Sequence, residues 1–185
     1  MRLAHIALGA NLPSPAGPPA ATLAAALQHI ASLGRIAARS SLYSTAPVGF
    51  ADQPRFLNAV VALSTDLAPR VLLDALLSIE RLFGRDRSAG LANGPRTIDV
   101  DLLLCGDLVL SESGLEIPHP RLAQRAFVLI PLVEIAPHAV DPRSGLTAAQ
   151  LLANLSPRSE AGEVVPFTSL LWPSESDRAS KEAKS

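Results

Sequence analysis

The chain has 185 residues, of which 48% are hydrophobic, and this length and composition are typical of one compact domain with a substantial core. The formal net charge of −1 leaves no broad positive field, so neither nucleic acid nor an anionic membrane is expected as a partner. The only cysteine, Cys105, excludes an internal disulfide and a thiolate zinc site, and it fits a reducing compartment.

Neither of the two apolar stretches of the chain is typical of a targeting or membrane segment. Residues 1–19 contain one arginine and a short apolar run, but Asn11 and the prolines after it come too early for a secretory signal. The apolar run 126–140 is interrupted by two prolines and a glutamate, which makes it too short to span a bilayer. We therefore expect a soluble, cytoplasmic protein.

The first part of the chain predicts three strands and a helix. Residues 3–9 are an apolar run typical of a buried strand, and residues 21–34 follow with apolar residues at helical spacing. Residues 35–44 and 55–65 are rich in β-branched, aromatic or alternating residues, which favours two further strands. The proline, glycine and aspartate between them predict an ordered, turn-rich loop.

The clearest helix is predicted for residues 67–84, where an apolar stripe follows a proline in the first turn. Glu80 lies near its C-terminal end, where a carboxylate opposes the helix dipole and needs a compensating cation or a function. Residues 84–96 have several glycines, three arginines and no periodicity, so we expect a mobile loop that leads into the next strand.

The rest of the chain adds a strand at 98–104, a short hairpin within 107–120 and a proline-interrupted helix at 125–137. The order strand, helix, strand, strand, helix, strand predicts an α+β protein, a ferredoxin-like α/β sandwich. In such a fold an antiparallel sheet carries its helices on one face, here with C-terminal additions. We expect one domain over residues 1–167 and a disordered polar tail over residues 168–185.

The strand at 98–104 carries two acids one residue apart. Because side chains alternate along a strand, its apolar residues, Leu104 included, should face the core while Asp99 and Asp101 face the other way. At about 6.5 Å, two such carboxylates repel by roughly 2.5 kcal/mol at an effective dielectric near 20, so a cation is expected between them. Mg²⁺ fits, since it takes one or two carboxylates together with water and phosphates. An exposed sheet edge where the acids meet only solvent or arginines is the alternative.

Five arginines flank the two acids in the sequence: Arg85, Arg87, Arg96, Arg121 and Arg125. Arginine holds phosphates through bidentate hydrogen bonds, so acids for a metal and arginines for phosphate together predict a nucleotide site. The sequence contains no P-loop, dinucleotide-binding glycine motif, G-x-S-x-G or H-E-x-x-H motif. His119 is the one histidine near the acids, and a structural role is its simpler interpretation.

The chain resembles the 6-hydroxymethyl-7,8-dihydropterin pyrophosphokinases, folate-pathway enzymes that transfer pyrophosphate from ATP to a pterin alcohol. The resemblance covers roughly residues 3 to 140, and its most specific segment is GPRTIDVDLLL, residues 94–104. Six further segments follow the family's order: IALGANL, YSTAPVG, FLNAVVAL, IERLFGR, IPHPRLAQRAFVL and PLVEIAP. The resemblance implies the same ferredoxin-like fold and a reaction that yields AMP and the pterin pyrophosphate.

For the nucleotide, the resemblance implies that Asp99 and Asp101 bind two Mg²⁺ ions that bridge the phosphates of ATP. The catalytic residues that it implies are Arg85, Arg87, Arg96, Asp99 and Asp101. The residues that it implies for ATP binding are Glu80, Arg85, Arg96, Ile98, His119 and Arg125.

For the pterin, the resemblance implies that Phe56 and Phe127 stack on the two faces of the ring system and that Asn58 reads its hydrogen-bonding edge. The other implied pterin-binding residues lie in the segment TAPVG: Thr45, Pro47 and Val48. Without the resemblance, both phenylalanines are interpretable as ordinary core residues. The chain also departs from some family members, with Asn93 in place of a tryptophan and Pro120 in place of an aromatic residue.

Two other functions stay open at this point. A ferredoxin-like RNA-binding or regulatory module predicts exposed aromatic residues on the strands and a basic surface, and the sequence shows neither an RNP motif nor a charge excess. A metal-dependent phosphohydrolase would use Asp99 and Asp101 but leaves the pterin residues unexplained. The expected partners are the small molecules ATP and 6-hydroxymethyl-7,8-dihydropterin, with no nucleic acid and no membrane, and we expect a monomer.

Overall fold

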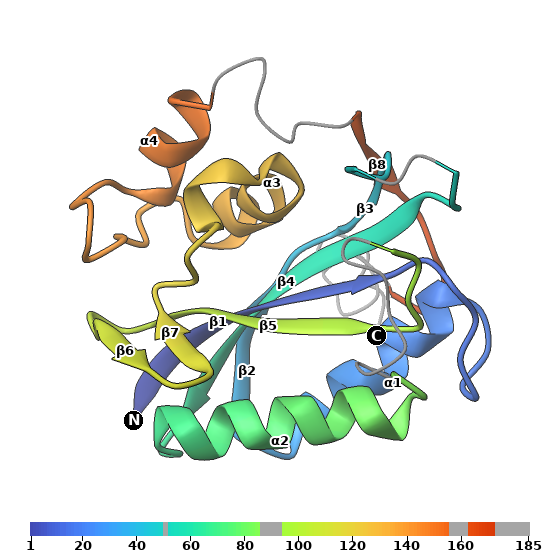
Figure 1. Ribbon diagram of the computed structural model, residues 1–185, viewed down its shortest axis with the longest axis horizontal. Helices are drawn as coiled ribbons and strands as arrows, with labels where there is room; N and C mark the ends of the chain where they lie inside the picture. The colour runs from blue at the N-terminus through green and yellow to red at the C-terminus, as the bar shows by residue number, and fades with distance from the viewer. Residues whose placement is uncertain (50–51, 86–93, 156–162, 173–185) are drawn as a thin grey trace, which may run out of the picture.

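The computed structural model describes residues 1–49, 52–85, 94–155 and 163–172. Within these ranges, a six-stranded sheet lies between two layers of helices (Figure 1). The elements in chain order are β1 (Arg2–Ala10), α1 (Pro19–Ala31), β2 (Arg35–Arg39), β3 (Leu42–Thr45), β4 (Phe56–Thr65), α2 (Pro69–Leu82), β5 (Asp99–Cys105), β6 (Leu110–Glu112), β7 (Leu115–Ile117), a 3-10 turn (Leu122–Gln124), α3 (Ala126–Ile135), α4 (Ala148–Ala153) and β8 (Val164–Phe167).

The sheet has the strand order β5-β1-β4-β3-β8, with β2 also paired to β4, and every neighbouring pair is antiparallel. The second strand of the expected pattern is divided into β2 and β3. The division falls at Ser41, whose backbone N–H donates to the Glu134 carboxylate on α3 at 2.9 Å instead of to a strand. The predicted ferredoxin-like sandwich is confirmed, including an antiparallel sheet whose α1 and α2 pack on one face.

Each face of the sheet carries its own hydrophobic cluster. The larger cluster joins the sheet to α1 and α2 through buried leucines and isoleucines, among them Ile6, Leu8, Leu23, Ile30, Leu72 and Leu76. The smaller cluster lies under α3 and α4 on the opposite face and includes Val60, Leu103, Leu129, Leu132 and Leu151. The C-terminal additions α3 and α4 cover part of this face (Figure 1). None of the helices in the described ranges is both long and apolar enough to cross a membrane.

β5 departs from simple alternation near its end. Its register with β1 shifts between the pairs Ile6–Leu102 and His5–Leu104, which leaves Leu103 as an extra residue. Beyond this irregularity, Leu104 packs in the smaller cluster beside Leu103. The expectation that Leu104 faces the larger core is therefore wrong, because an extra residue reverses which face the following side chains occupy.

Ordered structure continues past residue 167, where the sequence placed the start of a disordered tail. Trp172 is only 3% exposed, and its indole Nε1–H donates to the Ser40 carbonyl at 2.9 Å. The guanidinium of Arg39 lies over the Trp172 ring at 5.0 Å. Trp172 thus packs in the core, and residues 173–185 of the expected tail lie outside the described residues.

His5 is a buried polar side chain in an apolar setting. It is 5% exposed, and neither ring nitrogen has a hydrogen-bond partner among the described residues. Its neighbours on the adjacent strands are Ala62 and Leu104. Burial lowers the pKa of His5 to about 4, because desolvation penalises the imidazolium.

We expect His5→Leu to stabilise the protein most at acidic pH. Since the pKa of His5 in the folded state lies below that of the unfolded chain, the unfolded chain takes up the proton first as the pH falls. The free energy of unfolding of the wild type should therefore be unaffected by His5 protonation above about pH 6.5. At pH 5 it should be lower by about 2 kcal/mol. Urea unfolding of both proteins at about pH 7.5 and pH 5 measures the difference. A stability gap between variant and wild type that stays the same at both pH values would contradict this origin.

Candidate active site

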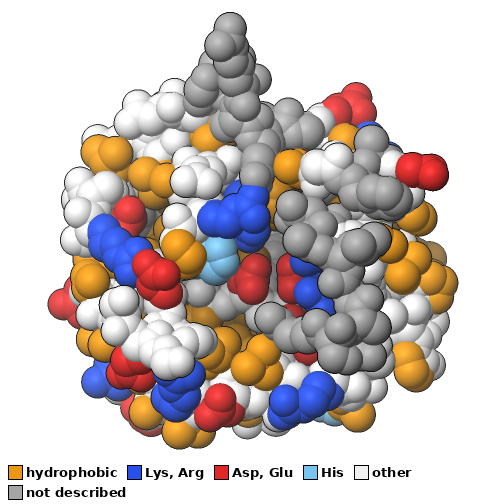
Figure 2. Space-filling model, viewed as in Figure 1, with side chains coloured by type: hydrophobic (Ala, Val, Ile, Leu, Met, Phe, Trp, Pro, Cys, Tyr) orange, Lys and Arg blue, Asp and Glu red, His pale blue; other side chains and the backbone are white. Residues whose placement is uncertain are grey.

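A pocket lies on the sheet face that α3 leaves open, and it draws residues from five elements. Its wall is made of β1, β3, β4, β5 and the start of α3, and it includes Gly9, Thr45, Ala46, Val48, Phe56, Asn58, Arg96, Asp99, Asp101, Arg125 and Phe127. Figure 2 shows carboxylate side chains in the middle of one face of the molecule, with basic side chains and a histidine beside them. Five of the six predicted pterin residues line this pocket, and Ala46 lines it in place of Pro47.

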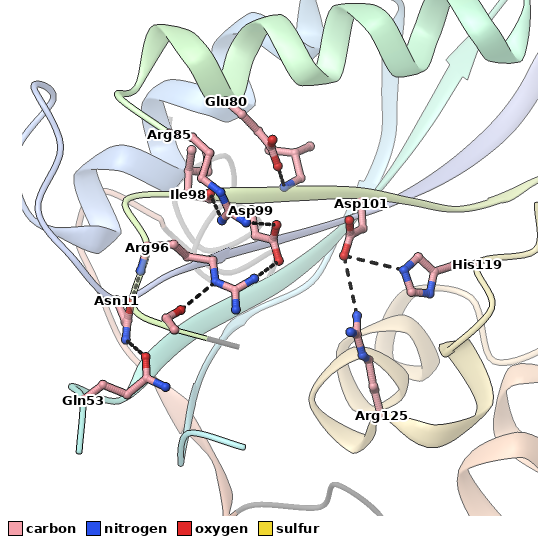
Figure 3. Close-up of polar contacts among 12 residues, drawn as sticks. Asn11, Gln53, Glu80, Arg85, Arg96, Ile98, Asp99, Asp101, His119 and Arg125 are labelled. Carbon is pink, nitrogen blue, oxygen red and sulfur yellow. Dashed lines mark hydrogen bonds and ion pairs between the residues drawn. The ribbon is translucent and has the colours of Figure 1, made fainter. Parts of the chain in front are cut away.

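Asp99 is held by two arginines (Figure 3). Arg96 Nη1 lies 2.7 Å from Asp99 Oδ2, and Arg85 Nη2 lies 3.3 Å from Oδ1. Arg85 also donates to the Ile98 carbonyl at 2.7 Å, which fixes the position of its guanidinium. Each carboxylate oxygen thus faces a cation, as expected for an acid whose repulsion from its neighbour must be offset.

Asp101 faces His119 and Arg125 from the other side of the pocket. Its Oδ2 lies 3.8 Å from His119 Nε2 and 3.6 Å from Arg125 Nη1. Burial, and then the charge of Arg125, lower the pKa of His119 to about 4, so the ring is neutral near pH 7. Its Nδ1 accepts from the Arg121 N–H at 3.1 Å, so the neutral ring carries its hydrogen on Nε2, the nitrogen that faces Asp101.

Glu80 is 1% exposed, and its Oε1 accepts the backbone N–H of Val100 at 2.8 Å. Val100 lies between the two acids, so this bond holds the edge of β5 that carries them (Figure 3). The carboxylate at the end of α2, which the sequence marked as needing a function, anchors the strand. Through this bond Glu80 positions Asp99 and Asp101.

Ile98, which the resemblance implied for ATP binding, directly precedes β5. Its side chain is fully buried in the larger core, and its carbonyl accepts from Arg85. A second hollow opens beyond Asp101, and the β5 residues in its wall are Val100, Asp101 and Leu102. The hollow lies between α2, the outer edge of β5 and the β6–β7 hairpin; its other lining residues include Leu73, Leu77, Leu115, His119 and Pro120. Alternation along the strand places the Ile98 side chain on the core face, and its role in ATP binding stays a prediction.

The aromatic end of the pocket is built around Asn58. This side chain is 7% exposed, and its Nδ2 donates to Thr45 Oγ1 at 2.8 Å, which fixes the orientation of the amide. A methyl group at Gly9 would lie 2.8 Å from Asn58 Oδ1, which is too close for a Cβ contact. Glycine at position 9 therefore allows the Asn58 amide to keep this position. Phe56 and Phe127 belong to the same pocket wall. The guanidinium of Arg96 lies 5.4 Å from the ring of Phe56, so the aromatic and charged ends adjoin.

Asn11 is a pocket-supporting residue to which the sequence gave no role. Its Nδ2 donates to Gln53 Oε1 at 3.0 Å and to the Pro54 carbonyl at 2.9 Å. Its Oδ1 accepts the backbone N–H of Arg96 at 2.8 Å (Figure 3). One buried amide therefore ties the segment before Phe56 to the segment that carries Arg96. The only sequence signal was a polar residue directly after an apolar strand.

Some predicted features fall outside the described residues. Arg87, Asn93 and half of the segment between α2 and β5 belong to residues 86–93, so the roles expected of them stay predictions.

The donor set at the centre of the pocket fits Mg²⁺. No group of three or more His, Cys, Asp and Glu side chains is placed to hold a metal within the described ranges. Two carboxylates are nevertheless the usual protein contribution to a Mg²⁺ ion that also binds phosphates and water. Asp99 and Asp101 are the residues that would hold it.

The chain is similar to known proteins over most of its length. Two curated relatives are each named 2-amino-4-hydroxy-6-hydroxymethyldihydropteridine pyrophosphokinase. The Methylorubrum extorquens protein is 44% identical over 85% of this chain and 96% of its own length. The Pseudomonas aeruginosa protein is 47% identical over 80% of this chain and 89% of its own length.

A solved structure of wild-type Plasmodium falciparum HPPK-DHPS shares the fold, with a TM-score of 0.63 and 16% identity. The match covers 82% of this chain and 44% of that longer chain. Residues 5–137 match the family described as 7,8-dihydro-6-hydroxymethylpterin-pyrophosphokinase, abbreviated HPPK. With this match over most of its length and with such close relatives, the chain belongs to the HPPK family.

Proposed function

We infer that the protein transfers pyrophosphate from ATP to 6-hydroxymethyl-7,8-dihydropterin, giving AMP and the pterin pyrophosphate, a step of folate biosynthesis. The observation that carries this inference is one pocket with two unlike ends. One end holds Asp99 and Asp101 with their arginines, and the other holds Asn58 and two phenylalanines. Membership of the HPPK family supports the same reaction.

In the proposed reaction, the pterin hydroxymethyl oxygen attacks the β-phosphorus of ATP in line with the bond to the α-phosphate oxygen. The new O–P bond forms as that bond breaks, AMP leaves with the bridging oxygen, and the hydroxyl proton passes to solvent. When bound, Mg²⁺ supplies positive charge to the phosphates, and we propose two ions at Asp99 and Asp101. Arg85 and Arg96 would stabilise the charge that develops on the phosphates.

The geometry suggests how the two substrates lie. We propose that the pterin occupies the end lined by Phe56, Asn58 and Phe127, where ring stacking supplies area and the amide supplies orientation. The nucleoside of ATP would lie in the hollow beside Leu102, on the other side of Asp101. The phosphates of ATP would then lie along Asp99 and Asp101, so that the β-phosphorus lies between the pterin and the nucleoside. Positioning accounts for much of the rate enhancement in such a site.

The test is to incubate the purified protein with ATP, Mg²⁺ and 6-hydroxymethyl-7,8-dihydropterin and to resolve nucleotides and pterins, with Asp99→Ala as the control. AMP formed in step with pterin pyrophosphate, and lost in the control, is the expected result. ADP and free phosphate made without a pterin requirement would instead identify a metal-dependent phosphohydrolase. The alternative of an RNA-binding or regulatory module is not supported by the family match.

Three further properties belong to the same proposal. We propose that residues 1–172 form a single pyrophosphokinase domain, five residues longer than the sequence suggested, because Trp172 packs in its core. We also propose a cytoplasmic location and a monomeric enzyme. Light scattering coupled to size-exclusion chromatography tests the last point, and a dimer mass at micromolar protein would refute it.

A further inference from the structure

Residues 163–172, here called the C-terminal strap, lie outside the 5–137 range of the family match, yet they pair with β3, which carries the pocket-lining residue Thr45. Within the strap, β8 pairs with β3 in a register that runs from Leu42–Phe167 to Thr45–Val164. Thr45 lines the pocket and accepts the hydrogen bond that orients Asn58. The strap therefore supports the strand that forms one wall of the pocket.

β3 depends on this support because it is short. Its four residues pair with β4 over only three positions, from Tyr43–Asn58 to Thr45–Phe56. β8 pairs with its other side and turns β3 from an edge strand into an internal one. The wall that carries Thr45 is thus held from both sides.

The strap also holds both ends of the segment that connects β3 to β4. At one end, the Ala46 N–H donates to the Glu163 carbonyl at 3.1 Å. At the other end, Arg55 Nη2 donates to the same Glu163 carbonyl at 3.1 Å. Ala46 lines the pocket and Arg55 directly precedes Phe56, so one carbonyl of the strap fixes the two ends of a pocket-lining segment.

Arg55 bridges the strap and β3 through several hydrogen bonds. Besides its bond to the Glu163 carbonyl, its guanidinium donates to Glu163 Oε2 at 2.9 Å and to Ser44 Oγ at 2.9 Å. It also donates to the Ser44 carbonyl at 3.1 Å. The ion pair alone contributes little, since Arg55 is 40% and Glu163 is 71% exposed. The planar guanidinium, by contrast, fixes two backbone segments relative to each other.

The far end of the strap is anchored independently. Trp172 is buried in the larger core and donates to the Ser40 carbonyl at 2.9 Å, one residue before the turn into β3. β8 and β5 form opposite ends of the strand order. The strap is therefore fixed beside the pterin end and remote from the edge where Leu102 borders the second hollow.

We propose that the C-terminal strap positions the pterin end of the pocket, with Arg55 as the positioning residue, and so sets the affinity for pterin without setting that for nucleotide. The proposal rests on the proposed function. It gives a role to a segment that lies outside the matched family range, and it predicts effects at Arg55, which contacts the start of the strap, and at Trp172, at its other end.

The test compares Arg55→Met and Trp172→Leu with Arg70→Met as the matched control. Arg70 makes the same kinds of bond, to the Glu112 carboxylate at 3.1 Å and to the Ser113 carbonyl at 2.9 Å, but it lies on α2. Pterin binding is followed by the fluorescence of 6-hydroxymethylpterin with Mg²⁺ and a non-hydrolysable ATP analogue. Nucleotide binding is followed by calorimetry with the same analogue, and folding by thermal unfolding.

Arg55→Met should raise the Kd for pterin about tenfold and change the Kd for nucleotide less than about twofold. Trp172→Leu should raise the pterin Kd about threefold in the same selective way, and Arg70→Met should leave it unchanged. Equal weakening of both ligands, or a pterin effect in Arg55→Met without one in Trp172→Leu, would overturn the role of the strap. A wild-type protein that binds nucleotide but no pterin would instead refute the proposed function itself.

Discussion

Replacing Asp101 by asparagine is expected to reduce kcat by at least about a thousandfold while the protein stays folded. The substitution keeps the size of the side chain and removes one of two neighbouring negative charges, so it lowers repulsion from Asp99 in the unliganded protein. It also removes a carboxylate that fits Mg²⁺. A metal ion supplies several kcal/mol of charge stabilisation in phosphate chemistry, and each 1.36 kcal/mol corresponds to about a tenfold change in rate.

The measurement is AMP release at saturating substrates, together with Mn²⁺ binding followed by electron paramagnetic resonance. Asp107→Asn is the matched control, because Asp107 is an exposed aspartate two residues beyond β5. The control should keep the wild-type kcat and metal affinity. If Asp101→Asn kept more than about a tenth of the wild-type kcat, Asp101 would not hold a metal needed for the reaction.

Local patterns predicted the placement of the two acids because strand alternation depends only on neighbouring residues. The pattern put Asp99 and Asp101 on the open face and Val100 in the core, as found. It failed at Leu104, where an irregularity in the pairing of β5 with β1 reverses the faces. Such an irregularity depends on the partner strand, and the sequence of β5 alone does not contain it.

The supporting residues were missed for a related reason: their bonds join distant parts of the chain. Asn11 reaches Arg96 across 85 positions, and Arg55 reaches Glu163 across 108. Neither residue has a motif of its own, since a single polar residue near a loop is common. β8 and Trp172 were missed because a short strand with a proline resembles a loop until its pairing with β3 is known.

Arg96→Met is expected to have two opposite effects. It should lower kcat about a hundredfold to a thousandfold, and it should raise the affinity for metal severalfold when nucleotide is absent. In the unliganded protein, Arg96 Nη1 lies 2.7 Å from Asp99 Oδ2, so its guanidinium pairs with a carboxylate oxygen that fits a metal ion. Removing the guanidinium leaves that oxygen to the metal and lowers competition from a fixed positive charge. The same removal takes away a cation that would stabilise the phosphates during transfer.

Methionine keeps the length of the side chain and the backbone bond from Arg96 N–H to Asn11, so the fold of this segment should persist. Mn²⁺ titration without nucleotide and AMP release with both substrates measure the two effects, and Arg81→Met, an exposed change on α2, should alter neither. Unchanged or weaker metal binding in Arg96→Met would mean that the arginine does not compete with the ion. Tighter metal binding with slower transfer would show that Arg96 restrains metal binding until phosphate is present, because phosphate then offers the guanidinium another partner.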